Sequence, residues 1–281
     1  MNAFPRTTVG GVSLPRMLIG SNWFLGYSHT SRAKDRFLHE HMDRGRIAGV
    51  IEAFLEAGVD AVMGPLSELL CEAAAEAQDR SGRQVVRILT PSFNIRPGGP
   101  PEEEPEPVFD RCRELGATFC FPHTSITDQL VDRFARRIRQ WDRLARLIRE
   151  RGMVPGLSTH LPESVVIADE SGADVESYIQ IYNAAGFLMH VEADWQMRII
   201  RGAAKPVMAI KPFAAGRLHP LVGLTFVWNT LRDQDMVTVG TMTPDEAREL
   251  IEISHSLLER RMPRHELQRT RSKAGLESAA P

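Results

Sequence analysis

The sequence predicts a single (β/α)8 TIM barrel of the α/β class. Eight short apolar runs alternate with amphipathic segments along the chain. Such alternation is typical of a parallel sheet with helices outside, and eight strands close a barrel whose interior side chains can fill. The length of 281 residues suits one such barrel. We expect one barrel over 1–263, because no linker separates two cores. The segment 264–281 is charged and rich in small residues, so we expect a flexible tail there.

The order of the elements follows from these runs. Gly10 and Gly11 lie between β-forming residues and predict a small hairpin over 7–14. Predicted barrel strands follow at 16–20, 60–63, 84–89, 117–121, 154–157, 175–182, 207–210 and 236–239. Predicted helices lie at 47–57, 67–77, 108–115, 126–150, from 162, 194–201, 221–231 and from 244.

Several residues support individual boundaries. Gly58 follows the first of these helices, as a C′ glycine does. Thr243, Pro244 and Glu246 match a capping box at the start of the last helix. The arginine-rich segment 126–150 is interpreted as one long helix with a solvated face.

Composition narrows the class of protein. A net charge of −2, with 43% apolar and 25% charged residues, is ordinary for a soluble globular chain. No basic run interleaved with aromatics suggests a nucleic-acid partner, and no apolar run approaches the roughly 18 residues of a membrane span. Three cysteines without pair spacing suit buried thiols in a reducing compartment. We therefore expect a cytoplasmic protein with a small-molecule substrate, and leave its oligomeric state open.

Lys211 is the first candidate for chemistry. The apolar strand 207–210 delivers it to the strand's end, and Pro212 and Gly216 then turn the chain. A lysine there faces water or meets a carboxylate, a phosphate or a substrate, because burial without a partner is costly. The carboxyl ends of barrel strands carry catalytic groups. A structural ion pair is the alternative.

Other polar residues fall at the same rim. His123 ends the predicted fourth strand and can exchange a proton near neutral pH. A long polar and aromatic loop follows the first strand, and such loops often bind ligands. We predict His123, Lys211 and Tyr27 as catalytic residues, with Tyr27 as a displaced proton donor. Predicted substrate-binding residues are Asn22, His29, Ser158, His160, Gln180 and Asn183. Each prediction has a structural alternative. His123 is then only a hydrogen-bonded histidine at the rim, His160 caps the following turn, and Tyr27 belongs to an aromatic plug.

Metal and phosphate sites have weaker support. His190 and Glu192 belong to an H-x-E-x-D string whose spacing matches no structural zinc motif, so they are weak candidates and no metal site is predicted. The acidic start of the last helix disfavours an anion there. The backbone at Gly240 and Thr241 could still hold a small phosphate.

Five segments, taken in order, resemble the aldo-keto reductase superfamily. They are VGGVSLPRMLIGSN, GLSTHLPES, YIQIYN, KPFAAGRL and VGTMTPDEA. The resemblance covers most of the barrel and implies that fold. It also implies NADP(H) as a candidate cofactor. A divalent metal is a weaker candidate, and it rests on the ligand types of the H-x-E-x-D string and not on the resemblance. Ser158 and Gln180 match positions that hold the nicotinamide amide in that family, and Gly240 and Thr241 lie where a cofactor phosphate is bound.

The family's catalytic Asp, Tyr, Lys and His are matched here only by His123. Met63 and Gly64 stand in place of the aspartate and its neighbour, and Thr90 in place of the lysine. Lys211 replaces a residue whose ring stacks on nicotinamide in many members. We therefore expect an aldo-keto-reductase-like barrel enzyme doing proton-transfer chemistry, as an isomerase, epimerase or lyase, on a small carbonyl- or hydroxyl-bearing metabolite. The alternatives are an NAD(P)H-dependent oxidoreductase with a substituted proton donor and a non-catalytic binding barrel.

Overall fold

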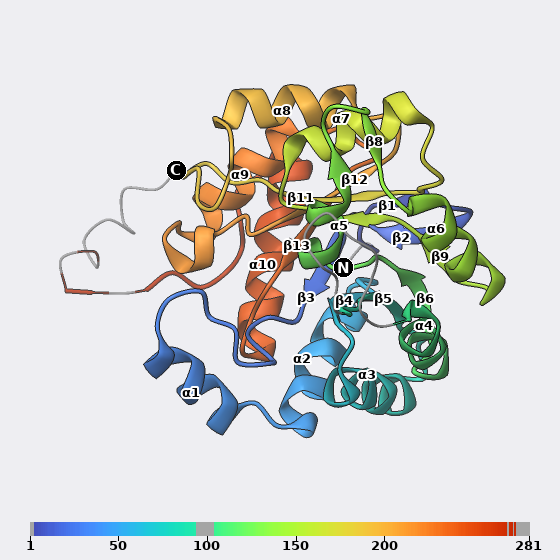
Figure 1. The fold of residues 1–281 in the computed structure, drawn as a ribbon. Coiled ribbons are helices and arrows are strands. Elements are labelled where there is room, and N and C mark those ends of the chain that lie inside the picture. The colour runs from blue at the N-terminus through green and yellow to red at the C-terminus, as the bar shows by residue number, and fades with distance from the viewer. Residues whose placement is uncertain (1–2, 94–103, 269, 272, 274–281) are drawn as a thin grey trace.

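A computed structural model describes residues 3–93, 104–268, 270, 271 and 273 (Figure 1). Parallel strands form its central sheet in the order β10-β11-β12-β13-β3-β4-β5-β6-β9. Their bounds are β3 Met17–Gly20, β4 Ala61–Pro65, β5 Val86–Thr90, β6 Ala117–Cys120, β9 Val154–Pro155, β10 Leu157–Ser158, β11 Tyr178–Ile181, β12 Val207–Ile210 and β13 Met236–Val239. Because β9 and β10 end the sheet order but are consecutive in the chain, the sheet closes on itself. The predicted (β/α)8 barrel is confirmed.

Gly156 separates β9 from β10 within the fifth barrel strand. A Cβ atom at this position would lie 2.4 Å from ring carbons of Phe121 and 2.7 Å from the carbonyl oxygen of Ser177. Contacts this short do not occur between real atoms, so a side chain would force the strand apart. Glycine therefore lets the fifth strand pass close to its neighbours and complete the barrel.

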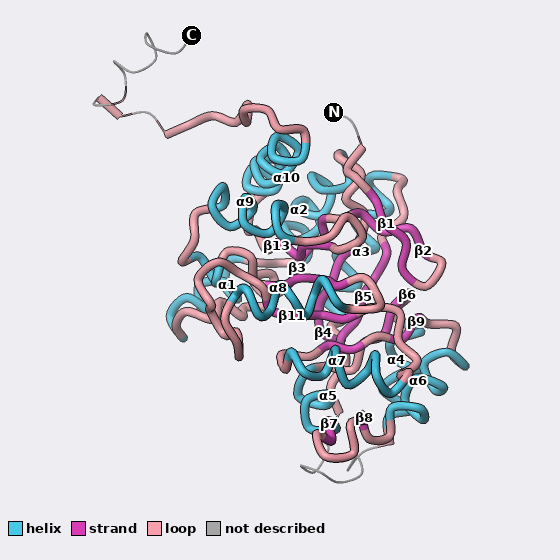
Figure 2. Tube along the Cα trace, turned by 90° about the horizontal axis from the view of Figure 1, so that it is seen from above, coloured by secondary structure: helices cyan, strands magenta, loops and turns pink. Residues whose placement is uncertain are grey.

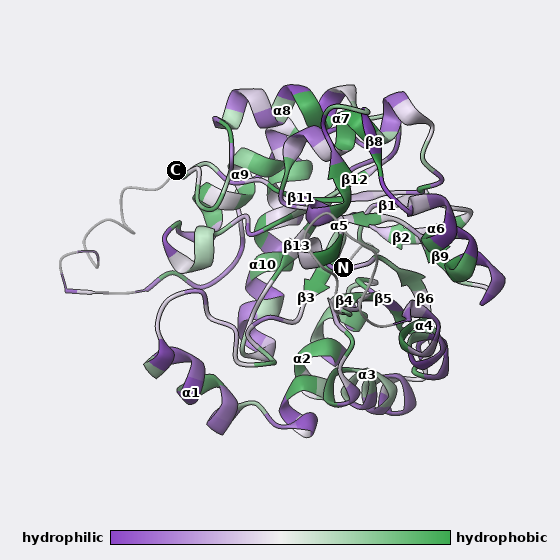
Figure 3. Cartoon of the chain, viewed as in Figure 1, coloured by the Kyte–Doolittle hydropathy of each residue, from purple (hydrophilic) through white to green (hydrophobic). Residues whose placement is uncertain are grey.

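Helices surround the barrel, as the view from above shows (Figure 2). Their bounds are α2 Arg44–Glu56, α3 Glu68–Ser81, α4 Pro105–Glu114, α6 Trp141–Glu150, α7 Pro162–Ser171, α8 Ala193–Gly202, α9 Pro220–Thr230 and α10 Pro244–Leu258. The capping box predicted for α10 is confirmed, since Thr243 accepts from the Glu246 N–H and Glu246 accepts from the Thr243 N–H. Central strands are coloured as apolar in Figure 3, whereas α1 is mostly polar.

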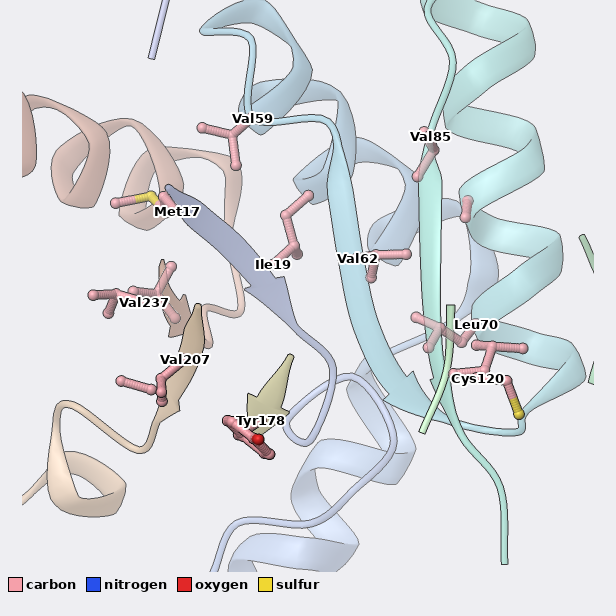
Figure 4. Close-up of a cluster of buried hydrophobic side chains, with 14 of the residues drawn as sticks. Met17, Ile19, Val59, Val62, Leu70, Val85, Cys120, Tyr178, Val207 and Val237 are labelled. Atoms are coloured by element: carbon pink, nitrogen blue, oxygen red, sulfur yellow. The ribbon is translucent and has the colours of Figure 1, made fainter. Parts of the chain in front are cut away.

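Two buried layers follow from the alternation of side chains along the strands. One layer, outside the barrel, includes Ile19, Val62, Val207 and Val237 packed beneath the helices (Figure 4). The other fills the barrel interior and includes Leu18, Ile88, Phe119, Met208 and Met236. The interior is thus a packed core in the described part of the chain.

The predicted N-terminal hairpin is confirmed and closes one end of the barrel. It consists of β1 (Arg6–Val9) and β2 (Val12–Pro15). Val9 and Leu14 are buried and pack with the barrel interior. Gly10 lies against Val154, near the start of the fifth strand. The hairpin therefore covers the amino ends of the strands and leaves their carboxyl ends free of it.

The long helix predicted over 126–150 is wrong. That segment forms part of α5 (Thr124–Leu130), a hairpin of β7 (Val131–Asp132) and β8 (Arg137–Ile138), and α6. The Asp132 carboxylate accepts the backbone N–H groups of Phe134 and Ala135, at 3.2 and 2.9 Å. A side chain that binds the backbone in this way favours a turn over a continuing helix.

The sequence analysis missed one helix, and parts of two expected segments lie outside the described residues. The loop after β3 leads into an unpredicted helix, α1 (Arg32–His41), whose start is capped by Ser31. Of the Pro/Glu-rich loop at 97–107, residues 97–103 lie outside the described residues, as does most of the expected tail at 264–281. Within the described residues, the helices are too short or too polar to cross a membrane.

Candidate active site

A cavity of about 1080 Å³ lies at the carboxyl ends of the barrel strands. Nine of the predicted site residues line it: Asn22, Tyr27, His29, His123, Ser158, His160, Lys211, Gly240 and Thr241. They come from segments that follow different strands, and the closed barrel brings them to one rim. The geometry thus agrees with the expectation that the functional groups would converge there, as they do in other barrels.

Lys211 lies at the end of β12 and reaches His29 across the cavity rim. Its Nζ atom donates to Nε2 of His29 at 2.9 Å. Burial lowers the pKa of Lys211 to about 8, because desolvation disfavours the ammonium form. Within residues 3–93 and 104–268, Lys211 forms no ion pair with a carboxylate, so the alternative of a structural ion pair has no support there.

The backbone of Lys211 is also unusual. Its φ angle is +61°, and that of its partner His29 is +57°. Residues with a Cβ atom rarely adopt this left-handed region. Both residues are therefore held in unfavourable conformations by the loops around them, and such strain is concentrated at functional sites.

His29 is positioned by the start of α1. The backbone N–H and the hydroxyl of Ser28 both donate to the Asp35 carboxylate, at 2.9 and 2.6 Å. Burial lowers the pKa of His29, and the nearby Lys211 charge lowers it further, whereas Asp35 acts in the opposite direction. A neutral imidazole at this position can accept the proton that Lys211 donates.

His123 caps the amino end of α5. Its Nδ1 atom accepts the backbone N–H of Ser125 at 3.2 Å and lies 2.9 Å from the Ser125 hydroxyl. Because Nδ1 accepts a proton donor, the neutral ring carries its own proton on Nε2. Burial lowers the pKa of His123, Asp128 opposes this change, and Lys211 adds to it. His123 is thus a hydrogen-bond donor through Nε2.

His160 is the most strongly shifted histidine of the cavity. Burial lowers its pKa to about 4, and the charge of Lys211 is the next contribution. Its backbone N–H lies 3.2 Å from both the Thr124 hydroxyl and the Asp128 carboxylate, which fix the turn after Ser158. The ring is therefore neutral at physiological pH and can accept a proton or a hydrogen bond.

The mouth of the cavity includes residues that the sequence analysis missed. They lie there together with Tyr27, a predicted residue whose side chain is 54% exposed. His219 lines the cavity and caps α9, and Glu246 and Glu249 line it from α10. The spacing of Glu246 and Glu249 on one helix face was a usable signal. The sequence signal for His219 is weaker: it precedes Pro220, which occupies the first position of a helix.

Gln180 and Asn183, predicted to bind substrate, do not line the cavity. Gln180 is buried on the helix side of β11, where its Nε2 donates to the Thr159 carbonyl at 3.1 Å and its Oε1 accepts from Gln196 at 2.8 Å. Since Ile179 lines the cavity, the next residue must face the opposite side. Gln180, predicted to bind substrate, therefore faces away from the cavity.

Asn183 instead stabilises the turn after β11. Its Oδ1 accepts the N–H groups of Ala185 and Phe187, and its Nδ2 donates to the Phe187 carbonyl, at 3.2, 2.9 and 3.0 Å. The weak metal candidates His190 and Glu192 are exposed and lie outside the cavity lining. The described residues contain no cluster of three or more His, Cys, Asp or Glu side chains that could hold a metal ion.

The groups present do not fit NADP(H) as the resembling family binds it. Glu246 accepts the N–H groups of Met242 and Thr243, at 2.6 and 3.3 Å, so the backbone donors nearest a phosphate are already occupied. Gln180 is engaged elsewhere, and the Lys211 ammonium would repel the positive ring of the oxidised cofactor. Thr241 Oγ1 is buried and finds no hydrogen-bond partner among the described residues, which leaves a polar contact open at this edge.

Comparison with known proteins places the fold. No protein-family model and no curated protein matches the chain. A Pseudomonas aeruginosa protein assigned as an aldo-keto reductase shares a TM-score of 0.63 at 13% identity, over 92% of this chain and 97% of that one. An aldo-keto reductase from Brucella melitensis matches with a TM-score of 0.58 and 14% sequence identity, and the match covers 96% of this chain and 95% of that one. Aldose reductase from Giardia lamblia matches with a TM-score of 0.51 and 12% sequence identity, and the match covers 97% of this chain and 91% of that one. The chain therefore has the barrel fold of the aldo-keto reductases.

Proposed function

We propose that this chain is an aldo-keto-reductase-like barrel enzyme that transfers protons next to the carbonyl of a small hydroxy-aldehyde or hydroxy-ketone, as an isomerase, epimerase or lyase. The observation that carries the proposal is the position of Lys211. It lines the cavity, donates to a histidine and has no carboxylate partner in the described part of the chain. A group of this kind can act on a carbonyl near neutral pH.

The charges of the cavity favour an uncharged, polyhydroxylated substrate. Within the described part of the lining, the Lys, Arg, Asp and Glu side chains are Lys211, Glu246 and Glu249. The two carboxylates disfavour a phosphate or a carboxylate at their side of the cavity. Side chains that can bind hydroxyls also line the cavity: Ser21, Asn22, Thr90, Ser92, Thr124 and Ser158. These groups suit several hydroxyl groups in one molecule.

Each rim residue then has a role consistent with its contacts. The substrate carbonyl accepts from His123 Nε2–H and is activated by Lys211. A neutral imidazole, His160 or His29, takes the proton from the neighbouring carbon. Asn22 and Ser158 bind hydroxyls, and Tyr27 closes the mouth or donates a proton to the product.

Proton exchange without a nicotinamide tests the proposal. Purified protein is incubated in D2O with hydroxyacetone, dihydroxyacetone, glyceraldehyde and erythrulose, and loss of the signal of the proton beside the carbonyl is followed by NMR. We expect exchange above the protein-free rate for at least one compound, abolished in Lys211→Ala. Turnover that appears only with added NADPH would overturn the proposal.

An NAD(P)H-dependent oxidoreductase is the second candidate. Its support is the full-length fold similarity to structures described as reductases. Tyr27 or Lys211 would then replace the family's proton donor. Quenching of protein fluorescence by NADPH, followed by carbonyl-dependent NADPH oxidation, would favour it. A non-catalytic binding barrel would gain support if His123→Ala and Lys211→Ala left every measurable function intact.

A further inference from the structure

We propose that Lys211 acts covalently, forming an imine with the carbonyl carbon of a hydroxy-aldehyde or hydroxy-ketone bound in the cavity. This inference rests on the proposed function and specifies how the carbonyl is activated. It differs from polarisation of the oxygen by a charged ammonium, because a nucleophile must be the free amine.

The surroundings of Lys211 supply the free amine. Its Nζ atom donates to His29 Nε2 at 2.9 Å, so an acceptor for the ammonium proton is already in contact. The residue lies in a desolvated part of the rim, where burial lowers the pKa of its amine to about 8. In about a tenth of the molecules the Lys211 amine is therefore unprotonated near pH 7. A lysine paired with a carboxylate would instead remain charged.

The histidines of the rim can complete the step. His29 takes one proton from the ammonium, and its exposure lets that proton pass to solvent. The nitrogen lone pair then forms a C–N bond, and the carbonyl oxygen accepts a hydrogen bond from His123 Nε2–H. The carbonyl π bond breaks as the C–N bond forms. The oxygen then takes up two protons, one released by the attacking nitrogen and one returned from solvent, and leaves as water when its C–O bond breaks. The protonated imine keeps one N–H proton of Lys211. No electrons are exchanged with an outside reagent, so no redox partner is needed.

The imine explains why the site needs no acid as strong as the family's missing tyrosine. A protonated imine withdraws electrons from the neighbouring carbon more strongly than a hydrogen-bonded carbonyl does. Removal of the neighbouring proton gives an enamine, and a weak neutral base such as His160 suffices for that step. The loops that impose left-handed backbone conformations on Lys211 and His29 place the amine beside its acceptor.

Reductive trapping tests the proposal. The protein is incubated with dihydroxyacetone and sodium cyanoborohydride, which reduces an imine to a stable secondary amine, and peptide mapping by mass spectrometry locates the adduct. We expect at least ten times more modification at Lys211 than at Lys205. The latter residue precedes the same strand at its amino end and is paired with Glu176 at 3.3 Å, so Lys205→Met should trap as much as the wild type.

Other outcomes separate the two proposals. Exchange beside the carbonyl without an adduct at Lys211 would overturn the imine and leave the proposed function intact. An adduct spread evenly over surface lysines would also overturn it. Mapping is carried out on the wild type, so the result does not depend on the folding of Lys211→Met. A trapping rate that rises as the pH increases through about 8 further supports the free amine as nucleophile.

Discussion

The Nζ atom of Lys211 lies 2.9 Å from Nε2 of His29, although the residues are 182 positions apart in the chain. Both have positive φ angles, +61° and +57°. Each such conformation costs on the order of 1 kcal/mol for a residue with a Cβ atom. The contact therefore joins two strained positions and a desolvated ammonium, an arrangement that reduces stability and that the proposed function would account for.

The first prediction concerns the stability cost of Lys211. Its pKa is about 8 in the folded state against 10.5 in the unfolded state. Between these values the unfolded chain binds more protons, so stability rises with pH across that window. At pH 7 the full cost applies, and Lys211→Met should raise the free energy of unfolding by up to about 3 kcal/mol.

Urea unfolding of both proteins at neutral and alkaline pH measures this effect. The difference between them should shrink as the pH rises through 8 to 10.5. Lys205→Met is the matched control and should show no such gain. A loss of stability in Lys211→Met at neutral pH would mean that the lysine is held by a favourable interaction instead.

His123 offers a substitution that separates capping from catalysis. Asparagine is a good helix N-cap, so His123→Asn can keep an acceptor for the Ser125 N–H while removing Nε2–H. We expect the exchange rate to fall by about 10²- to 10³-fold, as for loss of one preorganised donor. The thermal midpoint should stay close to the wild-type value, whereas His123→Ala should lower both. Unchanged exchange in His123→Asn would remove His123 from the reaction.

The barrel and its rim were predictable from the sequence because their signals are local. Apolar runs gave the strands, and a capping box marked the start of α10. Strand ends such as His123 and Lys211 meet at the same edge in any parallel barrel, so their convergence followed from the fold.

Local patterns could not decide features that depend on a single side chain or on strand parity. One carboxylate, Asp132, turns the segment that resembled a long helix. The side of the sheet that Gln180 faces depends on the parity of β11, which the residue pattern of the segment does not fix. The contact of Lys211 with His29 depends on two left-handed residues that no propensity indicates.

Gln180 should therefore matter for stability and not for substrate binding. Its amide is completely buried between Thr159 and Gln196. Gln180→Leu leaves the Gln196 amide and the Thr159 carbonyl without partners, which should reduce the free energy of unfolding by about 1–3 kcal/mol. The KM of the exchange reaction should be unchanged in protein that remains folded. A raised KM with normal stability would show that the side chain reaches the substrate after all.

His160 gives the last prediction, in acid. Its pKa is about 4 in the folded state against 6.5 in the unfolded state. The unfolded chain binds more protons between these values, so stability falls as the pH is lowered through that window, by up to about 3 kcal/mol. His160→Gln should reduce this acid loss, whereas replacement of the exposed His41 on α1 should leave it unchanged. Because His160 stays neutral above its pKa, acidification from pH 8 to pH 6 should slow the reaction chiefly through protonation of Lys211, and the acid limb should persist in the residual activity of His160→Gln. An acid limb that disappears in this variant would instead assign the controlling proton to the imidazole.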